Sequence, residues 1–109
     1  MVDIETFVKD CTKIANQHGW KIYWDKNRYF SKSDLTVGET LALIAGELVG
    51  EALEAYRDDK KEEFNEEIAD VLIRVFHLVG DLNIPIEKCL SDKMQVNKHR
   101  PYKHGRKNF

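Results

Sequence analysis

Apolar residues recur every three or four positions along most of the chain, which is the spacing of helices with one buried face. The first such segment covers residues 3–18. Gly19 follows it and predicts its end, because glycine readily adopts the backbone conformation that terminates helices. The apolar stripe of this first helix consists of Ile4, Phe7, Val8, Cys11, Ile14 and Ala15.

A second helix is predicted over residues 36–57. Thr36 and Glu39 have the spacing of a capping box, in which the two side chains satisfy free backbone amides at the start of a helix. Asp58 and Asp59 follow its last turn and predict a break.

A third helix is predicted over residues 60–82 and is apolar nearly all round, which is typical of a helix buried on several sides. Asn83 ends it, and Pro85 suits the first turn of a fourth helix over residues 85–98. Pro101 prevents that helix from continuing. Short connections favour antiparallel neighbours, so we expect an all-α, antiparallel four-helix bundle that is completed by oligomerisation.

Length and charge limit the function classes. The chain has 109 residues, which predicts a single domain over residues 1–109. Its net charge of −2 argues against general binding of nucleic-acid polymers. No stretch has the ~18 apolar residues of a membrane span, and the first residues lack the pattern of a signal peptide. With Cys11 and Cys89 as its two cysteines, and no paired spacing, we expect a reduced, cytoplasmic protein.

The charges are nevertheless segregated. Acidic residues dominate residues 39–70, whereas residues 93–107 carry Lys, Arg and His but no acid. The basic tail begins at about residue 99. An acidic middle and a basic end together indicate a site for metal ions and phosphates.

Five acids of the two central helices have a spacing that suits a metal. Glu47, Glu51 and Glu54 share one helix face, and Glu67 and Asp70 share another. Stacked carboxylates repel one another, and a divalent cation would relieve that repulsion. Oxygen ligands without thiolates favour Mg²⁺, with Mn²⁺ as an alternative. The other interpretation is a solvated acidic face.

A di-iron bundle requires Glu-x-x-His pairs. At His77 the residue three positions earlier is Arg74, so that signature is absent. We interpret His77, like His18 and His99, as a structural or surface residue.

Four segments in order resemble the MazG-like nucleotide pyrophosphohydrolases. The segments are Leu43-Ile44-x-x-Glu47-Leu48, Glu51-Ala52-Leu53-Glu54-Ala55-Tyr56-Arg57, Glu66-Glu67-Ile68-Ala69-Asp70-Val71-Leu72-Ile73-Arg74, and Lys93-Met94-x-x-Asn97-x-x-Arg100-Pro101-Tyr102-x-His104-Gly105. Gly19-Trp20 also fits the family, and the resemblance covers roughly residues 15–107. It implies an all-α homodimer or homotetramer that hydrolyses nucleoside triphosphates with Mg²⁺ to monophosphate and pyrophosphate.

The resemblance also implies metal ligands on two helices, as Glu-x-x-Glu and Glu-x-x-Asp. Glu67 and Asp70 match the second half, but Glu47 and Glu51 are one residue too far apart for the first. Three explanations remain open. A π-bulge absorbs the extra residue, or a ligand of a double-Glu motif has been replaced by Leu48, or Glu51 and Glu54 form the pair. We choose Glu47, Glu51, Glu67 and Asp70 as metal ligands.

Other roles follow from the hydrolysis that the resemblance implies and from the residues available for it. A carboxylate outside the ligand set, Glu54 or Glu66, would act as the catalytic base. Trp20, Trp24 and Tyr29 would stack on the nucleobase, although these aromatic side chains would equally serve to pin their loop to the bundle. The phosphate-binding residues would be Lys93, Asn97, Arg100, Lys103 and His104; the alternative for this basic segment is a solvated tail.

Two rival functions differ from an enzyme. The first is a non-catalytic module on the same fold that binds nucleotide and metal and has a regulatory role. The second is a purely structural helical dimer with solvated acids, for which Mg²⁺ would not stabilise the native state.

Overall fold

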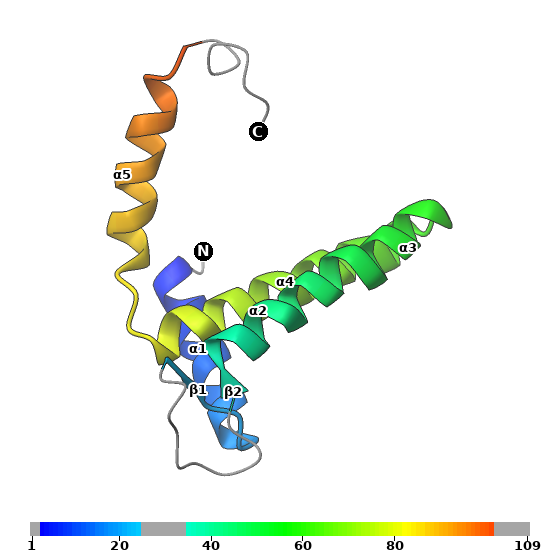
Figure 1. The fold of residues 1–109 in the computed structure, drawn as a ribbon, viewed down its shortest axis with the longest axis horizontal. Coiled ribbons are helices and arrows are strands. Elements are labelled where there is room, and N and C mark those ends of the chain that lie inside the picture. The colour runs from blue at the N-terminus through cyan, green and yellow to red at the C-terminus, as the bar shows by residue number, and fades with distance from the viewer. Residues whose placement is uncertain (1–2, 25–34, 102–109) are drawn as a thin grey trace.

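The computed structural model describes residues 3–24 and 35–101 (Figure 1). This part of the chain is predominantly helical. Its elements are α1 (Ile4–Gln17), β1 (Ile22–Tyr23), β2 (Leu35–Thr36), α2 (Val37–Gly46), the π-helix η1 (Glu47–Ala52), α3 (Leu53–Arg57), α4 (Lys61–Asp81) and α5 (Ile86–Lys98). The all-α class predicted from the sequence is confirmed.

Local capping sets the limits of α1. The side chain of Asp3 accepts a hydrogen bond from the backbone nitrogen of Thr6 at 2.8 Å, which satisfies a free amide of the first turn. At the other end, Gly19 has a φ of 88°, a left-handed conformation that suits glycine. Both ends lie where the sequence places them.

The elements α2, η1 and α3 follow one another without interruption and form a single helical rod. Thr36 and Glu39 make the predicted capping box at its start. Asp59 has a φ of 55° and turns the chain back after α3. The long helix α4 then runs antiparallel beside the rod, as Figure 1 shows. This antiparallel pair brings the two acidic segments together.

A short parallel strand pair was not predicted. Ile22 in β1 pairs with Leu35 in β2, and Tyr23 pairs with Thr36. Ile22 is only 1% exposed, which makes it the most deeply buried large side chain among the described residues. Each strand has two residues, too few for a sequence pattern to show. The pair fixes the end of α1 against the start of α2.

Helix α5 departs from the expected bundle. Pro85 is the residue that precedes α5 rather than the first residue within its first turn. Figure 1 shows α5 leaving the end of α4 and standing apart from the α2–α4 pair. Within one chain, therefore, α1, the central rod and α4 pack together, and α5 does not close a four-helix bundle with them.

The described part of the chain buries little apolar surface. Its buried apolar side chains are Ile22, Ala52, Ala55 and Val79. Large apolar side chains stay exposed on every helix, including Leu41, Leu48, Leu72, Ile73, Leu90 and Met94. The predicted burial of α4 on several sides is therefore not reached in a single chain. In the described ranges, none of the helices combines the length and apolar character needed to cross a bilayer.

Candidate metal centre

The first acidic motif lies in a π-helix. The helix η1 covers Glu47–Ala52, so the extra residue between Glu47 and Glu51 is accommodated by a wider turn. Of the three explanations offered for this spacing, the π-bulge is the one that agrees with the structure. Gly46 before this turn has ordinary helical angles, and Gly50 within it does not have a positive φ, so the widening does not depend on a conformation reserved for glycine.

The wide turn places its carboxylates against α4. One oxygen each from Glu47, Glu51 and Glu67 lies within 4.8 Å of the others, a separation that suits shared ligation of one cation. Glu47 and Glu67 are half-buried, whereas Glu51 is exposed. Three of the four predicted ligands are thus brought together by η1 and α4. We call Glu47, Glu51 and Glu67 the carboxylate cluster.

The crowding of the cluster changes its protonation. A hydrogen bond to Glu51, then burial and a hydrogen bond to Glu47, together with the negative charge of both neighbours, raise the pKa of Glu67 from 4.5 to about 7. Near neutral pH, the protonated and ionised forms of Glu67 are consequently both populated. A proton here does what a bound cation would do, because it relieves the repulsion between carboxylates.

When all three carboxylates of the cluster are ionised they only accept hydrogen bonds, and two of their oxygens then face no donor among the described residues. The Oε2 atoms of Glu47 and Glu67 are buried and unpaired within the described part of the chain. Buried polar atoms are normally satisfied, so such atoms require an explanation. A cation with oxygen ligands supplies one, and the residues present therefore fit Mg²⁺ or Mn²⁺.

The fourth predicted ligand lies at the edge of the site. Asp70 is exposed and outside the carboxylate cluster, but it lines an adjoining cavity together with Glu47. The cavity measures about 670 Å³ and has an apolar wall. Its lining consists of Cys11, Ile14, Ala15, Trp20, Leu35, Leu43, Glu47, Asp70, Ile73, Arg74 and His77. This size lies in the ordinary range for small-molecule sites.

The remaining predicted site residues are dispersed. Glu54 and Glu66 are exposed and outside the cluster. Among the predicted base-binding residues, Trp20 lines the cavity, Trp24 is 75% exposed outside it, and Tyr29 is not among the described residues. Only Trp20 is therefore positioned to contact a ligand there in the described structure.

The predicted phosphate-binding residues do not meet the cluster in one chain. Lys93 and Asn97 belong to α5, and Arg100 follows it, on the segment that stands apart from the central pair (Figure 1). Lys103 and His104 fall outside the described residues. A phosphate-binding role for α5 consequently requires an arrangement that a single chain does not provide.

Arg74 is a site residue that the sequence reasoning missed. Its Nε and one terminal nitrogen donate hydrogen bonds to Oε1 of Glu47 at 3.2 and 3.1 Å. The charge of Arg74 partly neutralises the cluster, and its hydrogen bonds orient Glu47. Arg74 lies four residues after Asp70, so its place on the same face of α4 could have been recognised.

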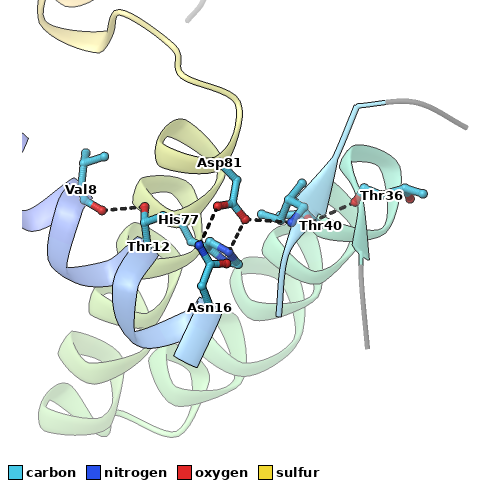
Figure 2. A network of polar contacts seen from close by, with 8 residues as sticks. Val8, Thr12, Asn16, Thr36, Thr40, His77 and Asp81 are labelled. Carbon is cyan, nitrogen blue, oxygen red and sulfur yellow. Dashed lines mark hydrogen bonds and ion pairs between the residues drawn. The ribbon is translucent and has the colours of Figure 1, made fainter. Parts of the chain in front are cut away.

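The interpretation of His77 as a structural residue agrees with the structure, in which its ring is buried and paired. Its Nε2 lies 2.8 Å from Oδ2 of Asp81, as Figure 2 shows. Asp81 also accepts hydrogen bonds from the side-chain nitrogen of Asn16, at 3.2 Å, and from the backbone nitrogen of Ile22, at 2.8 Å. Asp81 therefore ties α1, β1 and α4 together behind the cavity.

Comparisons with protein-family models, with curated proteins and with solved structures found no match to this chain.

Proposed function

We propose that this chain is a Mg²⁺-dependent nucleoside triphosphate pyrophosphohydrolase, the activity that its resemblance to the MazG-like family implies. One observation carries the proposal: the π-helix brings Glu47 and Glu51 together with Glu67 of α4, despite the extra residue in the first motif. Substrates would be ribonucleoside or deoxyribonucleoside triphosphates, and the expected compartment is the cytoplasm.

The carboxylate cluster would hold the metal, and Asp70 at the cavity edge would complete the ligand set once a nucleotide is bound. When bound, Mg²⁺ neutralises charge on the phosphates and lowers the pKa of a coordinated water. The two unpaired Oε2 atoms, on Glu47 and Glu67, support this assignment.

The chain's own residues would perform three further tasks. Arg74, whose side chain is 37% exposed, lies where it can both orient Glu47 and reach an anionic ligand in the cavity. Trp20 lines the cavity and would stack on the nucleobase. Glu54 and Glu66, which are free of the cluster, remain the candidates for the base that accepts a proton from the attacking water.

We further propose that a second copy of the chain completes the site, as a homodimer or homotetramer. Leu90, Met94 and Val96 expose apolar surface on α5, and Leu72 and Ile73 do so on α4. Pairing of such faces between copies would bury them. It would also allow Lys93, Asn97 and Arg100 of one copy to contact phosphates bound at the carboxylate cluster of the other.

The alternative of a non-catalytic nucleotide- and metal-binding module has one observation in its favour. Glu47 is already paired with Arg74, so part of its charge is neutralised before any metal binds. On this alternative, Mg²⁺ and nucleotide bind but no pyrophosphate is formed.

Pyrophosphate release from the eight common ribonucleoside and deoxyribonucleoside triphosphates, with Mg²⁺ and then with EDTA, tests the proposal. We expect metal-dependent release that is abolished by Glu67→Gln, because the amide removes the ligand charge at almost constant size. The matched control is Glu62→Gln, on the exposed first turn of the same helix, which should retain activity. Mg²⁺-dependent stabilisation without pyrophosphate would favour the binding module instead.

A further inference from the structure

The lining of the cavity beside the cluster includes one buried titratable ring that the proposed chemistry does not use. His77 lines this cavity, and its side chain is 10% exposed. The ring lies one helical turn beyond Arg74 on α4. Apolar side chains and Trp20 form much of the remaining wall. In mostly apolar pockets, a few fixed polar groups determine which ligand binds.

Asp81 fixes the proton of this ring. A carboxylate only accepts hydrogen bonds, so Nε2 of His77 must be the donor in the 2.8 Å contact with Oδ2 of Asp81. Asn16 and the backbone of Ile22 donate to the same carboxylate, whose side chain is only 1% exposed (Figure 2). With three donors holding it from three elements, Asp81 has little freedom to rotate and change the proton position.

In the neutral ring, Nδ1 is then unprotonated and acts as an acceptor. Among the described residues, the polar contacts of the His77 ring are made by Nε2, and Nδ1 is not one of the fully buried atoms that lack a partner. The ring of His77 therefore has one remaining polar atom, an acceptor, on a buried residue that lines the cavity.

We propose that Nδ1 of His77 accepts a hydrogen bond from the ligand of this cavity, which is consequently a planar base with an N–H donor on the edge that faces α4. This inference rests on the proposed function, because it places the nucleobase in the cavity and the phosphates at the carboxylate cluster. Trp20 would contribute apolar and stacking contacts, and the hydrogen bond to His77 would select bases that have a donor on that edge.

A conservative substitution separates the proposed ligand contact of His77 from its structural contact with Asp81. The side-chain amide of Gln replaces Nε2–H of histidine but leaves nothing at the position of Nδ1, so His77→Gln keeps a donor for Asp81 and removes the acceptor from the cavity. We expect this variant to retain the thermal stability of the wild type. His99→Gln, at an exposed position after α5, is the matched control.

The experiment titrates metal-free protein with the four 2′-deoxynucleosides at pH 8 and follows the ring nitrogens of His77 by ¹⁵N NMR. The nucleoside that binds most tightly is then compared with its N-methylated analogue, which lacks the donor. We expect a shift of Nδ1 on binding and about tenfold weaker binding of the analogue, the value of one hydrogen bond. In His77→Gln that tenfold difference should disappear.

Pyrophosphate release, measured in parallel, separates this inference from the proposed function. The role of His77 would be overturned, and the enzyme assignment left intact, by the following result. The protein hydrolyses nucleotides, the Nδ1 signal does not shift on nucleoside binding, and His77→Gln discriminates between the nucleoside and its N-methylated analogue as the wild type does. A shifted Nδ1 without hydrolysis would support the role of His77 and count against the enzyme. An unshifted Nδ1 without hydrolysis would overturn both.

Discussion

Arg74 of α4 donates two hydrogen bonds to a single oxygen of Glu47, which belongs to the π-helix on the neighbouring rod. Glu47 is 13% exposed at its side chain, so its charge is largely removed from water. Without a metal ion, the negative charge of this partly buried carboxylate needs another positive partner. We therefore expect Arg74 to stabilise the metal-free protein.

The first prediction concerns this pair. Replacing Arg74 by Gln should lower the free energy of unfolding in EDTA by about 1–3 kcal/mol, because Glu47 keeps a charge without its partner. Saturating Mg²⁺ should restore part of the loss, since the metal takes over neutralisation of the cluster. Chemical denaturation in EDTA and in Mg²⁺ measures both effects.

The control for this prediction is Lys88→Gln. Lys88 and Asp92 form a pair at 2.7 Å whose side chains are largely exposed. Its loss should cost no more than about 1 kcal/mol and should not respond to Mg²⁺. If Arg74→Gln behaves like Lys88→Gln, the pairing of Arg74 with Glu47 does not stabilise the protein.

The second prediction concerns pH. The pKa of Glu67 is about 7 in the fold, above its ordinary value of 4.5, so the folded state binds the proton more tightly than the unfolded chain does. The stabilisation from this group is complete below about pH 4.5 and is lost as the pH rises to about 7. Without metal, the free energy of unfolding should therefore fall across this window.

The measurement is urea denaturation of the wild type and of Glu67→Gln at closely spaced pH values. Groups outside the carboxylate cluster cancel in the difference, which should change between pH 4.5 and pH 7 and level off above. Mg²⁺ binding should strengthen over the same range, because the metal competes with the proton. A difference that stays constant with pH would contradict the altered pKa of Glu67.

The third prediction concerns the π-helix. Deleting Gly50 leaves Glu47 and Glu51 three residues apart, the spacing that an ordinary α-helical turn places on one face. Because the wide turn had absorbed one residue, α2 and α3 should keep their faces toward α4 after the deletion. We expect retained folding and a retained thermal shift with Mg²⁺.

Deletion of Ala69 is the matched control. It lies within the continuous α-helix α4, where removing one residue rotates all that follows by about 100°. That deletion should unfold the protein or abolish the response to Mg²⁺. Equal damage from both deletions would mean that the π-turn does not accommodate an inserted residue.

The fourth prediction concerns the contact between α1 and α4. A Cβ atom on Gly80 would overlap the hydroxyl of Thr12, which donates a hydrogen bond to the carbonyl of Val8 at 2.7 Å. We expect Gly80→Ala to destabilise the protein by about 1–3 kcal/mol. Gly46→Ala, where a Cβ meets no described atom within 4 Å, should be neutral or stabilising by up to about 1 kcal/mol. Thermal denaturation of the two variants compares them directly.

Local signals in the sequence predicted the helix ends well. The capping box of Thr36 and the turn at Asp59 depend on neighbouring residues, so their effect is visible in sequence. The pairing of Arg74 with Glu47, which spans 27 positions, depends on how two helices pack. Sequence spacing reveals which residues share a face of one helix, but not which residues of another helix face them.

The position of α5 shows the same limit. Its sequence indicates an amphipathic helix, and the helix is present. An apolar face on a helix does not identify what packs against it, and in a single chain the α5 residues Leu90 and Met94 stay exposed. The predicted meeting of Lys93 and Asn97 with the carboxylate cluster consequently stays a prediction that depends on a second copy.

One measurement tests the central claim most directly: ³¹P NMR of each nucleoside triphosphate during incubation with the protein and Mg²⁺, in parallel with Glu67→Gln. We predict that the wild type converts at least one nucleotide to its monophosphate and pyrophosphate, and that EDTA or Glu67→Gln stops the conversion. Unchanged spectra for every nucleotide, release of orthophosphate with a diphosphate, or full activity of Glu67→Gln would contradict the proposed hydrolysis at the carboxylate cluster.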